Sequence, residues 1–270
     1  MNTFGDKELL KQIIDYSKEL RLPAIRRYLE TALKEAKKNN LSYERFLHDL
    51  LQKEYDARLE NGKLNRIRIA NFPAKKHLED LKVEELPMDC QKKLNMLKSL
   101  DFVKNGQNVI LAGSPGTGKT HIAIGLGIKA AVAGYRVFFS TIPLLINQLK
   151  EARGASTLRS FELRFEKYDL VIADELGYIS FDKEGSELLF TNLSLRAGRK
   201  STIITTNLSF DRWDEIFLDP VITAAMIDRL THKSYMVNMN GPSYRMKETK
   251  EWLAKNKDVE EFLDKGDEVN

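Results

Sequence analysis

Apolar residues in the first part of the chain follow helical spacing. Within residues 9–14 they recur at i, i+1, i+4 and i+5, the pattern of one apolar helix face. Pro23 suits the first turn of a helix and predicts a second helix over Pro23–Lys38. A third predicted helix begins at Ser42 and runs toward Leu59. Three short helices with one apolar face each predict a small helical module.

The hydrophobic pattern changes from about Gln107 onward. Apolar runs too short for helices alternate there with amphipathic stretches of helical length. This alternation predicts βα units and a parallel sheet, so the expected fold class is α/β with a small all-helical domain in front. The predicted strands are Val109–Leu111, Val137–Phe139, Leu170–Ala173, Ile203–Thr205 and Tyr235–Met239, and the predicted helices are Ile122–Ala133, Leu144–Leu149, Glu187–Leu195 and Trp213–Phe217.

Turn signals and composition shifts predict four parts. The turn at Asn71-Phe72-Pro73 ends a helical domain over residues 1–72. Residues 73–106 are expected to form a linker with a lead-in helix, and residues 107–254 the α/β domain. Residues 255–270 carry six acids against three lysines, which predicts a flexible acidic tail.

Composition excludes several classes of protein. The 270 residues are 42% hydrophobic, enough for a folded core, so a disordered or low-complexity chain is excluded. The single cysteine, Cys90, cannot form an intrachain disulfide, and the four histidines show no metal-ligand spacing. No apolar run approaches the roughly 18 residues of a membrane span, and the first residues lack the apolar stretch of a signal peptide. We therefore expect a soluble, cytoplasmic protein with no membrane partner.

The net charge of +4 is unevenly distributed. Residues 1–76 hold 17 Lys and Arg against 11 Asp and Glu, whereas the remainder has a net charge of −2. Within Lys63–Lys76 there is no acid, a pattern that suits a DNA phosphate backbone and that a solvated helix face would also produce. The candidate DNA-binding residues are Lys63, Arg66, Arg68, Lys75 and Lys76.

A phosphate-binding loop follows the first predicted strand. Residues 113–120 match G-x-x-x-x-G-K-[ST] between a strand and a helix, where backbone N–H groups surround an anion at the helix N-terminus. Lys119 is expected to reach the β- and γ-phosphates of ATP, and Thr120 to offer its hydroxyl to Mg²⁺. The candidate nucleotide-binding residues here are Gly113, Ser114, Pro115, Gly116, Thr117, Gly118, Lys119, Thr120 and the adjoining His121.

Polar residues follow the third and fourth predicted strands. An acid pair after an apolar run can simply begin a turn, but downstream of a phosphate loop it favours catalysis. Asp174 is then expected to hold the Mg²⁺ shell and Glu175 to act as the base on the attacking water. Asn207 ends the next strand, where it can orient that water or serve as an ordinary turn residue. Arg229 lies on a later helical stretch, as a surface residue or as a finger reaching a neighbour's ATP.

These motifs together resemble the IstB-like ATPases, helper proteins of insertion-sequence transposition and relatives of the DnaC helicase loaders. The resemblance spans nearly the whole chain and rests on GSPGTGKT, LVIADELGYIS, STIITTN and AAMIDRLTHKSYMVNMNGPSYR. It implies an AAA+ core behind a DNA-binding helical module, with Gly113–Thr120 as the Walker A loop and Asp174–Glu175 as the Walker B pair. By the same resemblance Asn207 is sensor 1, Arg229 the trans-acting arginine finger and Arg245 a nucleotide contact in the manner of a second sensor.

The function implied by the resemblance is an ATPase that uses ATP and Mg²⁺, self-assembles on double-stranded DNA and presents target DNA to a partner transposase. The ATP-site motifs are equally compatible with a replicative helicase loader. A P-loop kinase of small molecules would need an arginine-rich lid where residues 141–153 predict a plain amphipathic helix. A module that only binds nucleotide would leave Glu175 without a role.

Overall fold

The computed structural model describes residues 3–217 and 219–264, with side chains from residue 7 to residue 255 apart from residue 218. The chain forms two compact units, Met1–Asn65 and Arg66–Asn270. The division falls inside a helix, ahead of the turn at which the sequence predicts the boundary. Ala70, which directly follows this helix, is fully buried in the core of the second unit, and its carbonyl accepts the N–H of Phe139.

The first unit contains helices α1 (Thr3–Glu19), α2 (Pro23–Lys38) and most of α3 (Tyr43–Ile69). The bounds of α2 are those that the sequence predicts, whereas α3 continues well beyond Leu59. The α2 N-cap residue makes no side-chain bond, and the buried carboxylate of Glu54 replaces it by accepting the N–H groups of Ala24 and Ile25. An anion at this position suits the positive end of the α2 dipole.

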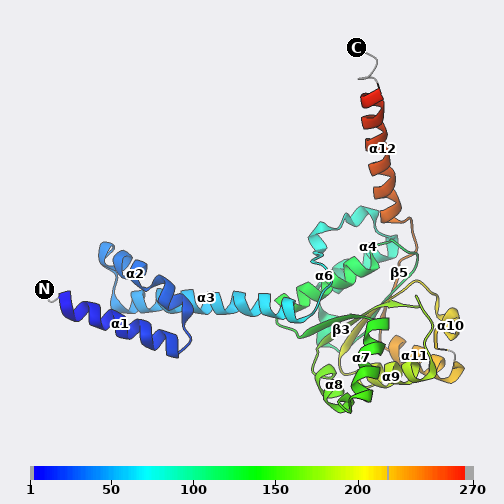
Figure 1. Ribbon diagram of the computed structural model, residues 1–270, viewed down its shortest axis with the longest axis horizontal. Helices are drawn as coiled ribbons and strands as arrows, with labels where there is room; N and C mark the ends of the chain where they lie inside the picture. Colours follow the sequence, from blue (N-terminus) through cyan, green and yellow to red (C-terminus); the bar gives the residue numbers. More distant parts are fainter. Residues whose placement is uncertain (1–2, 218, 265–270) are drawn as a thin grey trace. The chain divides into compact units, whose positions relative to one another are not determined.

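The second unit is built on a five-stranded parallel sheet (Figure 1). Its strand order is β2-β3-β4-β1-β5, so β1 lies between β4 and β5. The carboxyl ends of the strands therefore meet along one edge, where ligands of open α/β sheets bind. The strands are β1 (Val109–Ala112), β2 (Val137–Thr141), β3 (Leu170–Leu176), β4 (Ser201–Thr206) and β5 (Tyr235–Asn238).

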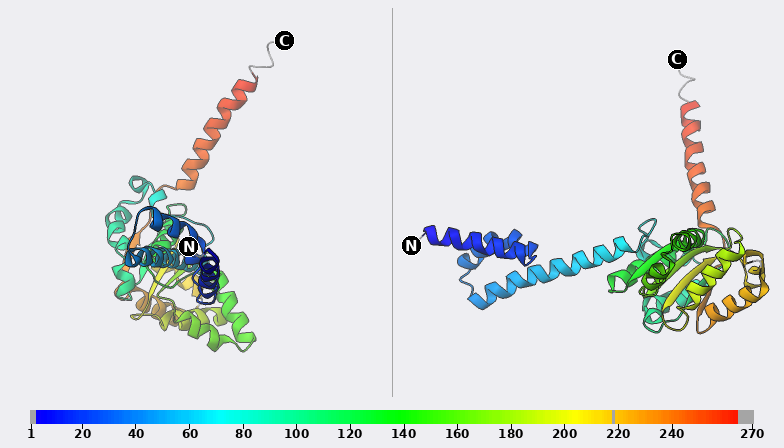
Figure 2. Two further views of the ribbon diagram at one scale, coloured as in Figure 1. Left: turned by 90° about the vertical axis from the view of Figure 1, so that its left-hand side faces the viewer. Right: turned by 60° about the horizontal axis from the view of Figure 1, so that its bottom comes forward.

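Helices cover both faces of the sheet, as the two views of Figure 2 show. Apolar residues of one face pack with α4 (Met88–Lys98), α5 (Asp101–Lys104) and α6 (Lys119–Val132). The opposite face packs against α7 (Ile142–Gly154), α8 (Leu158–Phe165), α9 (Lys183–Ser194), the short helix η3 (Phe210–Arg212), α10 (Asp214–Phe217) and α11 (Pro220–Thr231). The predicted α/β class is thereby confirmed.

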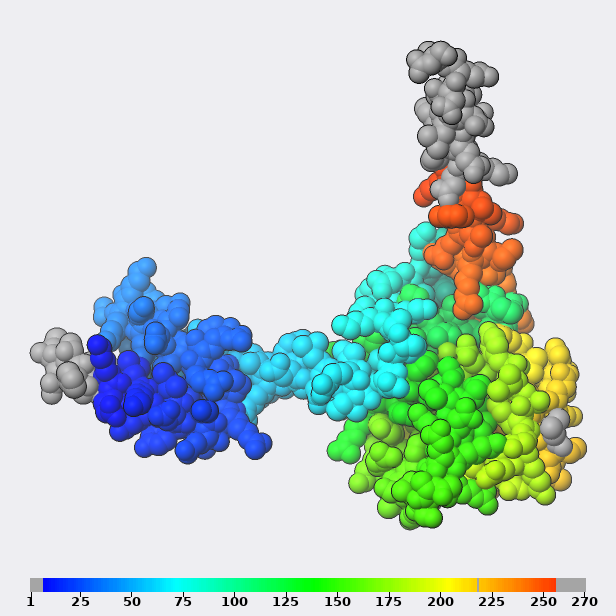
Figure 3. All heavy atoms as spheres, in the orientation of Figure 1, coloured from blue at the N-terminus to red at the C-terminus, as the bar shows by residue number. Residues whose placement is uncertain are grey.

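The segment ahead of β1 is folded onto the core. It contains the short helices η1 (Leu78–Asp80) and η2 (Val83–Glu85), and η1 contacts α6. The cyan residues of this segment lie against the green part of the second unit in Figure 3. After β5 the chain turns at residues 239–243 and enters α12 (Tyr244–Asp264). The backbone of the expected tail is thus helical to Asp264, and residues 265–270 lie outside the described residues. No helix in the described ranges has the length and apolar character needed to cross a membrane.

Candidate nucleotide site

The phosphate loop runs from the end of β1 to the first turn of α6, as the motif predicts. Gly116 and Gly118 have φ angles of +77° and +94°, backbone conformations that L side chains rarely adopt. These conformations turn the chain sharply between strand and helix. They leave Lys119 and Thr120 as the first two residues of α6.

Lys119 is buried within its own loop. Its Nζ donates to the carbonyl oxygens of Gly113 and Ser114, at 2.6 Å each. Burial lowers the pKa of Lys119 to about 8, with the Asp174 carboxyl acting to raise it and Arg245 to lower it further. The ammonium is therefore held at the loop by two carbonyls that an anion can replace.

The acid pair Asp174-Glu175 on β3 is positioned by two threonine hydroxyls. Thr120 Oγ1 donates to Asp174 Oδ1 at 3.1 Å, and Thr205 Oγ1 on β4 donates to the same oxygen. Thr205 Oγ1 also accepts the backbone N–H of Glu175 at 2.9 Å. Burial raises the pKa of Asp174, while the two hydroxyls, Lys76 and Lys119 all lower it.

Glu175 sits in a β-bulge. The register of β3 against β4 shifts between Ala173 and Leu176, and Glu175 has a φ of +66°. A non-glycine residue in this region is uncommon and costs about 1–3 kcal/mol, so its surroundings must hold it there. The bulge brings the Glu175 side chain to the pocket that lies over the phosphate loop. Burial and the neighbouring Asp174 raise the pKa of Glu175, and Arg245 lowers it.

The donor set fits a magnesium ion. Mg²⁺ prefers oxygen ligands and is commonly held by one carboxylate and a hydroxyl while retaining several waters. The Thr120 hydroxyl lines the pocket over the loop and donates to the Asp174 carboxylate, which is buried directly behind it. Among the described residues, this site included, no group of three or more His, Cys, Asp or Glu side chains could hold a metal ion.

A pocket of about 380 Å³, which we call the nucleotide pocket, lies over the phosphate loop. It gathers side chains from five regions of the second unit, including Asn207 after β4 and Arg245 on α12. His121 also lines it, and the His121 Nε2 lies 2.8 Å from the carbonyl oxygen of His77, which places a proton on Nε2. The charged and polar lining residues are Lys76, Asp80, Lys82, Thr117, Lys119, Thr120, His121, Glu175, Tyr178, Thr205, Thr206, Asn207, Tyr244, Arg245 and Glu248.

The segment after β5 supports the phosphate loop from behind. Asn240 Oδ1 accepts both the N–H and the hydroxyl of Ser114, at 3.1 and 3.3 Å. The N–H of Tyr244 donates to the Gly116 carbonyl at 2.8 Å. The approach is so close that a Cβ on Gly113 would lie 2.3 Å from the Met239 carbonyl carbon. The same segment delivers Arg245 to the pocket.

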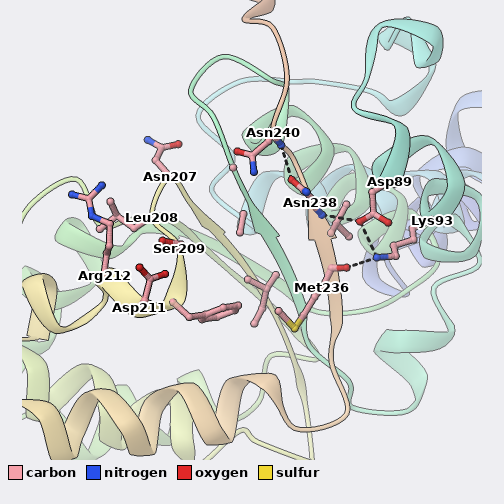
Figure 4. A pocket seen from close by; sticks show the side chains of 15 residues that line it. Asp89, Lys93, Asn207, Leu208, Ser209, Asp211, Arg212, Met236, Asn238 and Asn240 are labelled. Atoms are coloured by element: carbon pink, nitrogen blue, oxygen red, sulfur yellow. Dashed lines mark hydrogen bonds and ion pairs between the residues drawn. The ribbon is translucent and has the colours of Figure 1, made fainter.

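A second cavity of about 850 Å³ adjoins the loop on the β5 side. Figure 4 shows Asn207 and Arg212 along one side and Asn238, Asn240 and Lys93 along the other. A chain of hydrogen bonds crosses the second side, from Asn240 through Asn238 and Asp89 to Lys93 (Figure 4). These contacts occupy outward-facing backbone groups of β5, which is the last strand of the sheet. The phosphate loop is thus connected to α4.

Arg229 does not lie at the nucleotide pocket. It projects from the last turn of α11, is exposed, and has its guanidinium 5.0 Å from the centre of the Phe190 ring. Arg229 is absent from the residues that line the nucleotide pocket.

The five candidate DNA-binding residues have different surroundings. Lys63, in the first unit, pairs with Glu60 at 3.2 Å. In the second unit, Arg66 Nε donates to the Ala131 carbonyl at the end of α6, whereas Arg68 and Lys75 are exposed. Lys76 lines the nucleotide pocket.

Sequence reasoning missed three contributors to the site. Thr205 lies in a buried apolar strand and gives no local signal beyond its position two residues before Asn207. Asn240 belongs to an Asn-Gly-Pro turn, for which the turn alone is a sufficient explanation. Lys76 belongs to a basic stretch whose charge predicts contact with DNA and gives no signal for the nucleotide site. Only tertiary structure brings them to the nucleotide pocket and its loop.

Comparison with known proteins finds relatives over most of the chain. Residues 16–252 match the model of the IstB-like ATP-binding protein family. The chain is 38% identical to an ATP-binding protein of insertion sequence IS21 from Pseudomonas aeruginosa, covering 85% of this chain and 86% of the relative. It is 32% identical to the corresponding IS5376 protein of Geobacillus stearothermophilus, covering 92% and 99%.

A solved structure supports the fold. The structure of DnaA from Aquifex aeolicus, bound to AMPPCP, matches with a TM-score of 0.53 and 22% identity. The match covers 68% of this chain and 56% of DnaA, so the chain spans little more than half of that protein. At this identity the likeness concerns the AAA+ fold alone.

Proposed function

Because this chain belongs to the family of IstB-like ATP-binding proteins, we propose that it is a Mg²⁺-dependent ATPase that assembles on duplex DNA for a partner transposase. The observation that carries the hydrolytic part is the convergence of Lys119 and Glu175 on one pocket. A protein that only binds nucleotide has no use for a carboxylate held in a strained bulge at the phosphate end.

Each residue of the proposed reaction has a distinct part. The loop N–H groups and Lys119 bind the phosphates. Thr120 and Asp174 would hold a Mg²⁺ ion, which would supply positive charge to neutralise the charge that develops on the phosphates. Glu175 accepts the proton of the attacking water. Its raised pKa brings it closer to the range in which a general base is efficient. Asn207, at the adjoining end of β4, orients that water.

Self-assembly is supported by the position of Arg229. Its guanidinium is exposed on α11 and does not line its own nucleotide pocket, so a role in hydrolysis requires a neighbouring copy. DNA contact is proposed for the domain expected over residues 1–72 and for the exposed Arg68 and Lys75. The transposase is proposed because the relatives are proteins of insertion sequences.

The proposal is tested with purified protein, ATP, Mg²⁺ and a DNA duplex. We expect phosphate release, salt-sensitive DNA binding and ATP-dependent higher oligomers visible by electron microscopy. Glu175→Gln is expected to keep ATP binding and trap the assembly, whereas Lys119→Ala loses both. Protein that binds DNA and oligomerises identically with and without ATP would refute the ATP-dependent assembly.

The partner is tested separately. The cognate transposase and the replicative helicase of the same cell are offered to the ATP-bound complex of the Glu175→Gln variant. Selective capture of the transposase supports the proposal. Selective capture of the helicase would replace it with the helicase-loader function, which the same ATP site would serve.

A further inference from the structure

The linker between α3 and η1 brings a lysine to the nucleotide pocket. Lys76 lines this pocket together with Lys119, Thr120 and Glu175, although it precedes the phosphate loop by more than thirty residues. It is half-buried, whereas the adjacent Lys75 is exposed and does not line the pocket. Two neighbouring lysines of one basic stretch therefore have different surroundings.

The path of the linker is determined by its packing on α6. Phe72 lies against Gly127, where an added Cβ would be 2.9 Å from its ring. Leu78 lies against Gly125, where an added Cβ would be 2.6 Å from its Cδ2. Glycine at both positions lets the linker lie directly on the helix. Phe72 and Leu78 thus hold the linker on α6 on either side of Lys76, which limits the positions that the Lys76 side chain can reach.

A hydrogen bond secures the end of this path beside the loop. His121, in the first turn of α6, bonds the carbonyl oxygen of His77 at 2.8 Å. His77 directly follows Lys76, so this bond holds the backbone next to Lys76 against the same helical turn that presents Lys119 and Thr120. The placement of Lys76 is a built feature of the second unit.

The charges at the pocket suit a polyanion. Lys76 and Lys119 line the same pocket as Thr120, whose hydroxyl donates to the Asp174 carboxylate. Asp174 marks the metal side of the site, where the terminal phosphate of a bound nucleoside triphosphate lies. A second ammonium on this side adds an attraction that depends on that phosphate.

We propose that Lys76 is a nucleotide-binding residue that contacts the terminal phosphate of a nucleoside triphosphate from the chain's own linker. This inference rests on the proposed function and deepens it. The contact ties the linker to the phosphate only while the triphosphate is present. Loss of the γ-phosphate releases Lys76, so the protein discriminates triphosphate from diphosphate partly through this residue.

The test compares Lys76→Gln with Lys75→Gln, a matched control that removes the same charge one residue earlier. Affinities for a non-hydrolysable ATP analogue and for ADP are measured with Mg²⁺ on the full chain. Lys76→Gln is expected to weaken analogue binding about tenfold and ADP binding less than about twofold. Lys76→Arg keeps the charge and is expected to restore most of the analogue affinity. Lys75→Gln should leave both affinities unchanged.

A second readout follows the lysines directly. Each is acetylated by an amine-reactive reagent with and without the ATP analogue, and the modification is located by mass spectrometry. The analogue, but not ADP, is expected to protect Lys76, and Lys75 should react equally in all samples. Duplex binding is measured in parallel at saturating ATP analogue, where Lys76→Gln should retain the wild-type affinity.

Two results would overturn the inference. One is wild-type analogue affinity in Lys76→Gln while Lys119→Ala abolishes binding. The other is a loss of DNA affinity in Lys76→Gln with unchanged nucleotide affinity, which would assign Lys76 to DNA. Failure of the proposed function is distinguishable, because wild-type protein would then release no phosphate or assemble without regard to ATP, whereas the Lys76 comparison measures only nucleotide affinity.

Discussion

Thr205 Oγ1 accepts the backbone N–H of Glu175 at 2.9 Å while donating to Asp174 Oδ1. One hydroxyl on β4 thus orients the metal-side carboxylate and holds the bulge that brings the proposed base to the pocket. Thr205 is almost fully buried, so no water can replace it without rearrangement. It is a positioning residue, because it acts through the two acids.

Replacing Thr205 with valine is expected to reduce kcat about ten- to a hundredfold with little change in KM for ATP. Valine keeps the shape but removes the donor to Asp174 and leaves the Glu175 N–H without its acceptor. Steady-state phosphate release over a range of ATP concentrations measures both parameters. Thr205→Ser retains the hydroxyl and should keep most of the activity. Equal losses in the serine and valine variants would show that packing is what matters.

Nucleotide binding is expected to take up protons at alkaline pH. Lys119 has a pKa of about 8 in the free protein, and phosphate oxygens that replace its carbonyl partners favour the charged form. Between about pH 8 and 10, binding therefore protonates Lys119, and ATP affinity falls as pH rises. Calorimetry in two buffers of different ionisation enthalpy measures this uptake. Absence of proton uptake at pH 9 would contradict the lowered pKa.

The same shift has a consequence for folding. The unfolded chain retains the Lys119 proton up to its ordinary pKa of 10.5, so it binds more protons than the folded protein above about pH 8. The contribution of Lys119 to the free energy of unfolding therefore rises with pH between about 8 and 10.5. Urea unfolding at a series of pH values should show this rise in the wild type and not in Lys119→Met.

Gly113→Ala is expected to destabilise the protein more than Gly134→Ala. Gly113 and Gly134 have φ angles of +149° and +105°, so alanine is unfavourable at both. Only at Gly113 would the new Cβ meet the backbone of Met239, whereas nothing lies within 4 Å at Gly134. We expect a loss of about 1 kcal/mol for Gly134→Ala and several times more for Gly113→Ala. Thermal and urea unfolding measure both, and equal losses would show that Met239 moves away easily.

Arg229→Ala is expected to lower assembly-dependent hydrolysis about a thousandfold while ATP binding is retained. Its guanidinium is exposed on α11, so it can act on the ATP of a neighbouring copy. Arg159→Ala, at an exposed arginine of α8, is the matched control and should remain active. A mixture of Arg229→Ala and Glu175→Gln proteins should recover activity at sites that combine the intact Glu175 and Arg229. A mixture with no recovery would exclude action in trans.

Much of the nucleotide site could be predicted from the sequence because its signals are local. Consecutive residues 113–120 carry the phosphate loop, and the apolar run before Asp174-Glu175 identifies a buried strand that ends in acids. Likewise, the bounds of α2 follow from a proline at its start and two asparagines after its end. The change from helical spacing to short apolar runs predicts the α/β class, because the spacing of apolar residues reflects which faces of a helix or strand are buried.

The remaining features depend on contacts between distant residues. α3 continues to Ile69, beyond the predicted end, and is followed by Ala70, which is buried in the core of the second unit. Glu54 caps a helix thirty residues away in the sequence. Thr205 meets Glu175 only because β3 and β4 are adjacent and a bulge shifts their register. Lys76 reaches the pocket because glycines on α6 admit the linker.

The sequence by itself therefore determined the class of fold, the phosphate loop and the acid pair, since each is encoded by neighbouring residues and their periodicity. Tertiary structure decided which hydroxyl orients the acids, which segment supports the loop and which of two adjacent lysines lines the nucleotide pocket. These depend on strand order, register and the depth of grooves between elements, physical quantities that a local pattern does not contain.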